Sequence, residues 1–193
     1  MDRGNNGLRS KWGERFTKAT LVQGALATGL TAYLLYQGVF GVPAASRIVA
    51  GGGAGVWLTV GYFAYIIMGV LATMAVALFF RHLELDLKRK FNKWTSGLAW
   101  ITLVMWNIGV IGATWLMMYA GYTGGAAALP TTSGGLGYNA GQVHSLIMVG
   151  YPTPIAIFMA VAVFGAFLGL LDAALVWLRP AKVEAPVEAS VGQ

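Results

Sequence analysis

Four long apolar runs alternate with short polar segments along the chain, at residues 19–40, 56–80, 97–121 and 153–178. As an α-helix rising about 1.5 Å per residue, each run is long enough to cross a hydrocarbon layer of about 30 Å. A helix also satisfies its own backbone hydrogen bonds in lipid. The pattern therefore predicts an all-α integral membrane protein built as a four-helix bundle.

These runs divide the chain into three parts. Residues 1–18 form a basic N-terminal segment, residues 19–178 hold the four-helix transmembrane domain, and residues 179–193 form a short tail of mixed charge. The small residues from Pro43 to Ser46 would suit cleavage of a signal peptide. The first run is longer than the about 7–15 apolar residues of a secretory signal, which favours a retained helix. Pro180 ends the last helix, and the tail is expected to be disordered and cytoplasmic.

Positive charge is distributed unevenly over the loops. The chain carries five Lys and Arg before the first run, one between the first two runs, five at residues 81–96, none between the last two runs and two in the tail. Short loops rich in Lys and Arg stay on the cytoplasmic side. Both termini are therefore expected to be cytoplasmic, in a multi-pass protein of the plasma membrane.

Spacing within the basic loop predicts how far the second helix continues. Glu84 with Lys88 and Asp86 with Lys90 are four residues apart, a spacing that places opposite charges side by side on a helix. We therefore expect the second helix to extend past the membrane surface and to end near Asn92.

The segments expected on the outer side carry little charge. Residues 41–55 are rich in glycine and are expected to form a turn, while residues 122–141 contain no charged residue. Long loops of this kind often cover a site or pack on a neighbour. Pro152 and Pro154 interrupt the apolar sequence that follows, so residues 141–149 are expected to form a short outer surface helix before the fourth span.

Composition agrees with a membrane protein and excludes several kinds of chemistry. The chain is 57% hydrophobic and 10% charged, with a mean hydropathy of +0.65. Its net charge of +6 comes mainly from basic segments beside the apolar runs, where it orients the protein, so no nucleic-acid partner is expected. The chain has no cysteine, which excludes disulfides and thiolate metal ligands.

The two histidines, His82 and His144, are the candidate cofactor ligands. His82 follows the second run on the cytoplasmic side and His144 precedes the fourth run on the outer side, so roughly 30 Å separates them. They cannot bind one haem or one metal ion together, and no metal site or cofactor is expected within this chain alone. Each is expected to make an interfacial hydrogen bond or to act as a ligand completed by another chain.

Asp172 is an acidic residue inside an apolar run, where a carboxylate is costly and often functional. Gly165 and Gly169 precede it at helical spacing, so a neighbouring helix is expected to approach this face closely. Counting residues along the helices places Thr20 and Gln23 at a similar depth, as candidate partners. Two roles for Asp172 follow: a structural hydrogen bond or an anchor near the interface, and a proton relay or cofactor contact.

Asn107 lies near the middle of the third run, with Gly109 and Gly112 close by. A mid-membrane amide usually forms a hydrogen bond to another helix. We therefore expect Asn107 to hold helices together and the two glycines to mark positions of close packing.

Four short segments carry a resemblance to a known family. They are Trp57-Leu58-Thr59-Val60-Gly61-Tyr62, Arg81-His82-Leu83-Glu84, Gly141-Gln142-Val143-His144 and Tyr151-Pro152-Thr153-Pro154. In the order of these segments and the spacing of its helices, the chain resembles the short subunit-I-like membrane proteins associated with archaeal haem–copper oxidases. The resemblance implies a respiratory or related redox complex, with haem or copper in larger partner subunits. The family's catalytic core needs a set of histidines that this chain lacks, so an accessory subunit is implied.

Three functional hypotheses follow. The first is a non-catalytic accessory subunit of a terminal oxidase or a copper membrane monooxygenase, packed on its partners through small-residue faces and the uncharged outer loop. The second is a homo-oligomeric transporter or proton channel built around Asp172. The third is an enzyme acting on a lipid-soluble substrate at the inner face, with Arg81, His82 and Glu84 grouped there.

Overall fold

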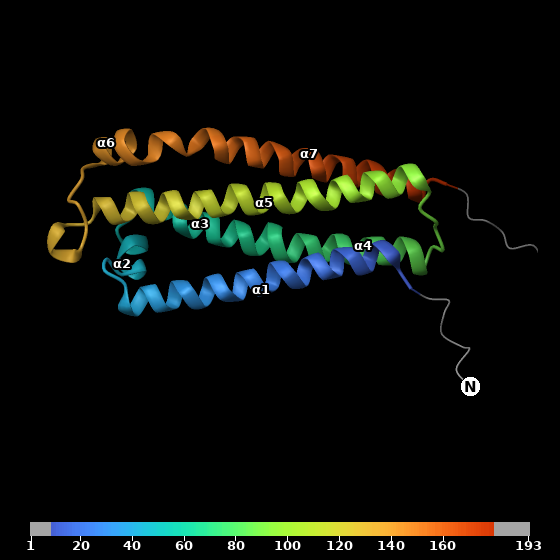
Figure 1. The fold of residues 1–193 in the computed structure, drawn as a ribbon, viewed down its shortest axis with the longest axis horizontal. Helices are drawn as coiled ribbons and strands as arrows, with labels where there is room; N and C mark the ends of the chain where they lie inside the picture. The colour runs from blue at the N-terminus through green and yellow to red at the C-terminus, as the bar shows by residue number, and fades with distance from the viewer. Residues whose placement is uncertain (1–8, 180–193) are drawn as a thin grey trace, which may run out of the picture.

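The computed structural model describes residues 9–179, and every regular element in this part of the chain is helical. Four long helical segments lie side by side and give the molecule an elongated shape (Figure 1). They are α1 (Lys11–Phe40), the continuous series α3 (Val56–Ala64), η2 (Tyr65–Ala72) and α4 (Thr73–Leu85), then α5 (Lys93–Ala128) and α7 (Pro152–Trp177). The prediction of an all-helical fold is confirmed for these residues.

Short helices gather at the end of the molecule where α1 finishes (Figure 1). They are α2 (Ala45–Ala50), η1 (Gly53–Gly55), η3 (Thr131–Ser133), α6 (Ala140–Gln142), η4 (Val143–Ile147) and η5 (Met148–Gly150). The last three follow one another directly before α7. They form the short helical segment that the two prolines predict ahead of the last long helix.

Three helical stretches are long and apolar enough to cross a membrane: Gly53–Leu85, Lys93–Ala128 and Pro152–Trp177. They correspond to the second, third and fourth runs of the sequence. α1 is not among them, although it has 30 residues, because polar side chains such as Gln23 and Gln37 interrupt its apolar positions.

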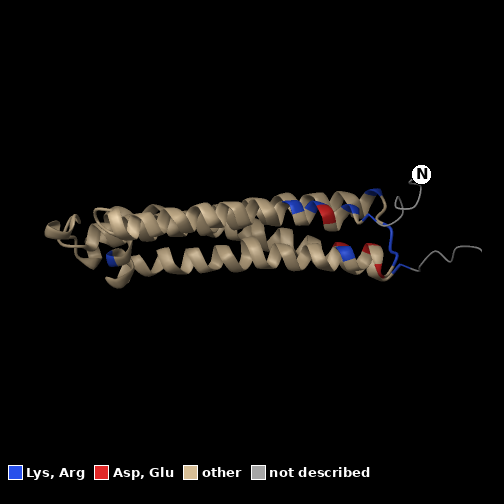
Figure 2. Ribbon diagram, turned by 90° about the horizontal axis from the view of Figure 1, so that it is seen from below, with Lys and Arg blue, Asp and Glu red and all other residues tan. Residues whose placement is uncertain are grey.

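Charged residues distinguish the two ends of the molecule (Figure 2). Within residues 9–179, every Lys and Arg except Arg47 lies toward the end where α1 begins and α4 stops. We call this the basic end, and we call the opposite end, which carries the short helices, the loop end. The uneven charge seen along the sequence is therefore also a separation in space.

The helix α5 is longer than the sequence pattern predicts, because it continues from Gly121 to Ala128 through residues assigned to the outer loop. The glycines that suggested a loop lie at contacts with neighbouring helices. A Cβ on Gly124 would stand 2.9 Å from the Cβ of Ala54, and one on Gly125 would stand 2.9 Å from the Cα of Gly55. Close packing offsets the low helix propensity of glycine here. The predicted loop at residues 122–141 is therefore wrong in its first third.

The helix α4 ends at Leu85, so the predicted extension to Asn92 is also wrong. Lys88 has a φ of 51°, a left-handed conformation that no α-helix continues through. The predicted pairs Glu84–Lys88 and Asp86–Lys90 are replaced by other partners: Asp86 Oδ2 lies 2.6 Å from His82 Nδ1, and Glu84 turns toward α1. The loop folds back because its apolar side chains, Leu87 and Phe91, pack on the core of the basic end.

The helix α1 begins inside the predicted N-terminal segment, at Lys11. The carboxylate of Glu84 accepts hydrogen bonds from the backbone N of Trp12 at 2.9 Å and of Gly13 at 3.3 Å, and from the hydroxyl of Ser10. A negative charge is favourable at a helix N-terminus, where backbone N–H groups have no partner within the helix. Trp12 and Phe16 are then fully buried against α4 and α7.

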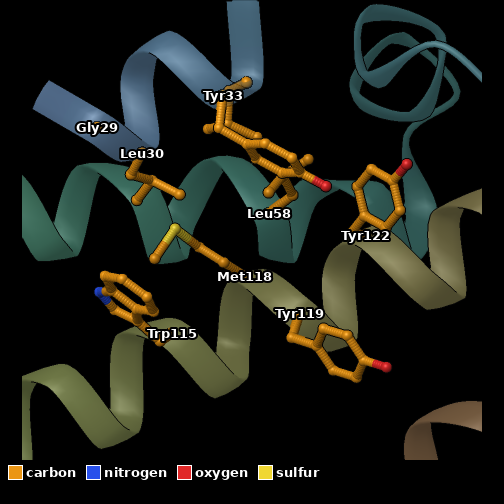
Figure 3. Close-up of a pocket in the computed structure, with 9 residues that line it drawn as sticks. Gly29, Leu30, Tyr33, Leu58, Trp115, Met118, Tyr119 and Tyr122 are labelled. Atoms are coloured by element: carbon orange, nitrogen blue, oxygen red, sulfur yellow. The ribbon is translucent and has the colours of Figure 1, made fainter. Parts of the chain in front are cut away.

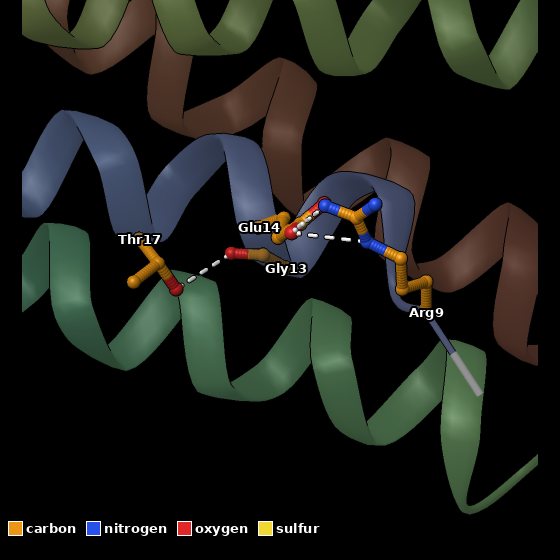
Figure 4. A network of polar contacts seen from close by, with 4 residues as sticks. All are labelled: Arg9, Gly13, Glu14 and Thr17. Atoms are coloured by element: carbon orange, nitrogen blue, oxygen red, sulfur yellow. Dashed lines mark hydrogen bonds and ion pairs between the residues drawn. The ribbon is translucent and has the colours of Figure 1, made fainter. Parts of the chain in front are cut away.

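The first turns of α1 also carry an exposed polar network (Figure 4). Arg9 Nη2 donates to Glu14 Oε1 at 2.7 Å, and Thr17 Oγ1 donates to the carbonyl oxygen of Gly13 at 2.7 Å. The hydrogen bond from Arg9 lowers the pKa of the Glu14 carboxyl below its usual value. Residues 1–8 and 180–193, which include most of the predicted disordered tail, lie outside the described part of the chain.

Candidate functional site

The helices α5 and α7 pack closely because glycines on both face the partner helix. A Cβ on Gly109 would lie 2.4 Å from the backbone N of Ala162, and one on Gly165 would lie 2.9 Å from the backbone N of Trp106. These distances leave no room for a larger residue. The glycines selected from the sequence, Gly109, Gly112, Gly165 and Gly169, all lie at this intramolecular contact.

Asp172 lies in the same interface, one turn after Gly169, and its side chain is fully buried. Among residues 9–179, neither of its carboxylate oxygens has a hydrogen-bond partner. The hydroxyl of Thr102, which faces Gly169 from α5, also lacks a partner within this range. The interface thus contains two buried polar side chains that residues 9–179 leave unsatisfied, which is costly in a low-dielectric interior.

The partners expected for Asp172 are wrong. Thr20 Oγ1 donates to the carbonyl oxygen of Phe16 at 2.9 Å, within its own helix. Gln23 is buried, but its side chain contacts Asn107 and Tyr65. Counting residues gave a similar depth for these positions, but it could not give the rotation of α1, which turns Gln23 toward α5 and η2.

A polar network joins three helices in the interior. Gln23 Nε2 of α1 donates to Asn107 Oδ1 of α5 at 2.7 Å, and the hydroxyl of Tyr65 in η2 donates to Gln23 Oε1 at 2.5 Å. Asn107 Nδ2 donates in turn to the carbonyl oxygen of Leu103 at 2.7 Å. The interhelical hydrogen bond expected for Asn107 is therefore present.

The π-helical segment η2 (Tyr65–Ala72) interrupts the second long helix between two buried polar residues. Tyr65 begins the segment and bonds to α1, while Thr73 follows it and accepts a hydrogen bond from Trp106 Nε1 of α5 at 3.0 Å. A Cβ on Gly69 would lie 2.9 Å from the ring of Tyr65, so this glycine makes room for the tyrosine. π-Helical turns are rare and recur at functional sites.

The histidines lie at opposite ends of the molecule, as the sequence predicted. His82 is exposed near the end of α4 and bonds to Asp86, and His144 is exposed in η4 at the loop end. Within residues 9–179, no group of three or more His, Cys, Asp or Glu side chains could hold a metal ion together.

The inner-face trio of the third hypothesis does not converge. Arg81 and His82 are exposed, and His82 turns toward Asp86. Glu84 is occupied by the N-terminus of α1. These contacts give the three side chains separate structural surroundings, and an enzyme built on them is not supported.

Several of the polar residues in these contacts were missed by sequence reasoning. Tyr65 and Thr73 lie eight residues apart in an apolar run, and a polar group recurring every two helical turns is a signal for a shared buried face. Trp106 lies in the third apolar run, and an indole N–H in a membrane interior needs an acceptor, which is a signal for a buried polar contact. Ser10 lies directly before α1, and serine is a preferred N-cap residue.

Comparison with known protein families, with curated proteins and with solved structures found no match for this chain.

Proposed function

We propose that this chain is a non-catalytic accessory subunit of a membrane redox complex, of the terminal oxidase or copper membrane monooxygenase type. The resemblance of its four short segments to subunit-I-like proteins of archaeal haem–copper oxidases motivates the redox assignment. Three helices able to cross a membrane provide the setting in which such complexes work. The haem or copper of the complex belongs, in this proposal, to larger partner subunits.

The observation that carries the proposal is the position of His82 and His144. They are the two histidines of the whole chain, and they lie at opposite ends of the molecule. A haem or copper centre needs several ligands that converge within about 2.0–2.3 Å of the metal. In such a complex, each of these histidines serves as an interfacial hydrogen-bonding residue or as one ligand of a site that another chain completes.

We further propose that all four long helices cross the plasma membrane, with both termini in the cytoplasm. α1 lies alongside the three apolar stretches and, with 30 residues, is long enough to cross the bilayer (Figure 1). The basic end faces the cytoplasm because Lys and Arg in short loops are retained there (Figure 2).

The sequence suggested two surfaces for contact with partner subunits, the small-residue faces and the uncharged outer loop. The face of α7 that carries Gly165 and Gly169 is covered by α5 of the same chain, so no partner helix can pack on it. The uncharged segment between α5 and α6 at the loop end remains free for this role, together with the lipid-facing sides of the helices.

Purification from the native membrane in a mild detergent tests the accessory-subunit proposal. We expect larger chains rich in histidine to co-purify, with a haem absorption spectrum or stoichiometric copper in the complex. A variant in which both His82 and His144 are replaced by Ala tests whether the histidines bind metal or only form interfacial hydrogen bonds. Loss of metal while the complex stays intact shows that at least one of them is a metal ligand. A colourless, metal-free homo-oligomer from the native membrane would overturn the proposal.

The buried carboxylate of Asp172 favours a second candidate function, the movement of protons or small solutes across the membrane. An unpaired acidic group inside a membrane helix commonly marks an ion or proton path. Because Asp172 is fully buried within one chain, the path in this candidate runs through each subunit and not between copies. The test measures flux into proteoliposomes. Loss of flux in Asp172→Asn, with unchanged flux in Asp86→Asn, would establish the transport function. Equal flux in the two variants would rule this function out.

A further inference from the structure

A cavity of about 440 Å³ separates the second half of α1 from α3 and α5. α1 packs on α4 and η2 near the basic end and meets α2 at the loop end, and the cavity occupies the space between these two contacts. It is lined by Gly29, Leu30, Tyr33, Leu34, Leu58, Trp115, Met118, Tyr119 and Tyr122. Since α3 and α5 belong to stretches able to span a membrane, the cavity opens at a level where hydrocarbon chains surround the protein.

The lining of the cavity changes from apolar to phenolic along its length (Figure 3). Leu30 and Trp115 lie at one end, and the hydroxyls of Tyr33 and Tyr122 lie together at the end nearer the loop end of the molecule. Tyrosine hydroxyls suit the level of lipid head groups, and the aliphatic lining suits a hydrocarbon tail. The cavity therefore has the polarity of an amphiphile, with its polar end toward the membrane surface.

The volume of the cavity suits a narrow and flexible ligand. At about 440 Å³, it falls within the range of about 300–1,000 Å³ that is typical of sites for small molecules. A hydrocarbon chain can follow such a space between helices and leave its polar group at the tyrosines.

We propose that this cavity binds the hydrocarbon chain of a membrane amphiphile, with the polar group of the ligand at Tyr33 and Tyr122. The chain can come from a phospholipid or from an isoprenoid quinone, since both present a long flexible apolar tail below a polar head. The ligand fills open space between α1, α3 and α5, which a packed interior avoids leaving empty. This site is independent of the accessory-subunit proposal.

Gly29 provides a direct way to close the cavity. A Cβ at this position would meet no atom within 4 Å, and Gly29 faces the cavity from α1. A larger side chain there enters the cavity without forcing the helices apart. Gly24, one and a half turns earlier on α1, also has open space beside it but does not line the cavity, so Gly24→Leu is the matched control for Gly29→Leu.

The test uses the full chain reconstituted in phosphatidylcholine vesicles that contain a phospholipid with a photoactivatable diazirine in its acyl chain. After irradiation, labelled residues are identified by mass spectrometry. Met118 is 5% exposed and lines this cavity, so label reaches it through the cavity, whereas Ile108 is 54% exposed and reports ordinary lipid contact. We expect label at Met118 in the wild-type chain, and about tenfold less at this position in Gly29→Leu.

Each outcome of this experiment supports or overturns the proposal. Label at Ile108 without label at Met118 in the wild-type chain overturns it, whatever the variants do. Equal labelling of Met118 in Gly29→Leu and Gly24→Leu also overturns it. If the cavity is labelled, competition identifies the source of the hydrocarbon chain. Displacement of the labelled phospholipid by a long-chain isoprenoid quinone at low mole fraction identifies a quinone tail. Displacement by bulk phospholipid alone identifies a lipid acyl chain.

Discussion

Gln23 of α1 and Asn107 of α5 are hydrogen-bonded at 2.7 Å across the interior of the protein, 84 positions apart in the sequence. The same Gln23 amide accepts a hydrogen bond from the hydroxyl of Tyr65, so one side chain connects three helices. In a membrane, where the hydrophobic effect does not drive helices together, such contacts and close packing hold the fold.

Replacing Gln23 by Leu is expected to lower the free energy of unfolding by about 1–2 kcal/mol, because it leaves Tyr65 and Asn107 buried without this partner. Unfolding by SDS in mixed micelles measures the change. Gln37→Leu is the control, since Gln37 donates to Tyr33 at an exposed position. Equal stability of the two variants would mean that the network does not hold the helices together.

Gly109→Ala is expected to destabilise the protein by about 1–3 kcal/mol, because the new methyl group would clash with the backbone of α7. Gly97→Ala in the same helix meets open space and is expected to stabilise it by about 0.5–1 kcal/mol through helix propensity. The same unfolding measurement compares them. A neutral Gly109→Ala would show that α5 and α7 can separate without cost.

Glu84→Ala is expected to lower stability by about 1 kcal/mol, since it removes the acceptor for the first backbone N–H groups of α1. The control is Glu14→Gln, at the exposed ion pair with Arg9. Arg9 lowers the pKa of the Glu14 carboxyl, so the pair adds a small amount to the stability of the folded protein at pH values above the unfolded pKa. This contribution is lost as the pH falls through the lower folded pKa. A larger loss in Glu14→Gln than in Glu84→Ala at pH 7 would contradict the capping role of Glu84.

Asp172→Asn is expected to leave the protein as stable as the wild type or more stable. The substitution keeps the shape of the side chain and removes a carboxylate that has no partner among the described residues. A loss of more than about 1 kcal/mol in SDS unfolding would instead indicate a specific partner for the carboxylate.

The proposed orientation can be tested without background, because the chain has no native cysteine. Lys90→Cys at the basic end and Thr132→Cys at the loop end are both exposed. A membrane-impermeant maleimide added to intact cells is expected to label Thr132→Cys at once and Lys90→Cys after permeabilisation. The reverse pattern would place the basic end outside.

Glycines show how far local sequence reasoning reaches in this protein. Gly165 and Gly169 were interpreted as a packing face, and they are one, yet the helix they meet is α5 of the same chain. Gly124 and Gly125 fall in the predicted outer loop, although they lie within α5. The same residue breaks an isolated helix and permits two helices to touch, and only the position of the second helix distinguishes these roles.

The sequence by itself determined the helical class, the apolar stretches and the separation of charge between two ends. These properties depend on how each residue interacts with lipid, water or its near neighbours, and they can be summed along the chain. Only the tertiary structure decided that Gln23 pairs with Asn107 and not with Asp172, and that Glu84 caps α1. Such partners depend on the rotation and depth of one helix against another. The packing of all the helices sets this geometry, and a run of apolar residues does not define it.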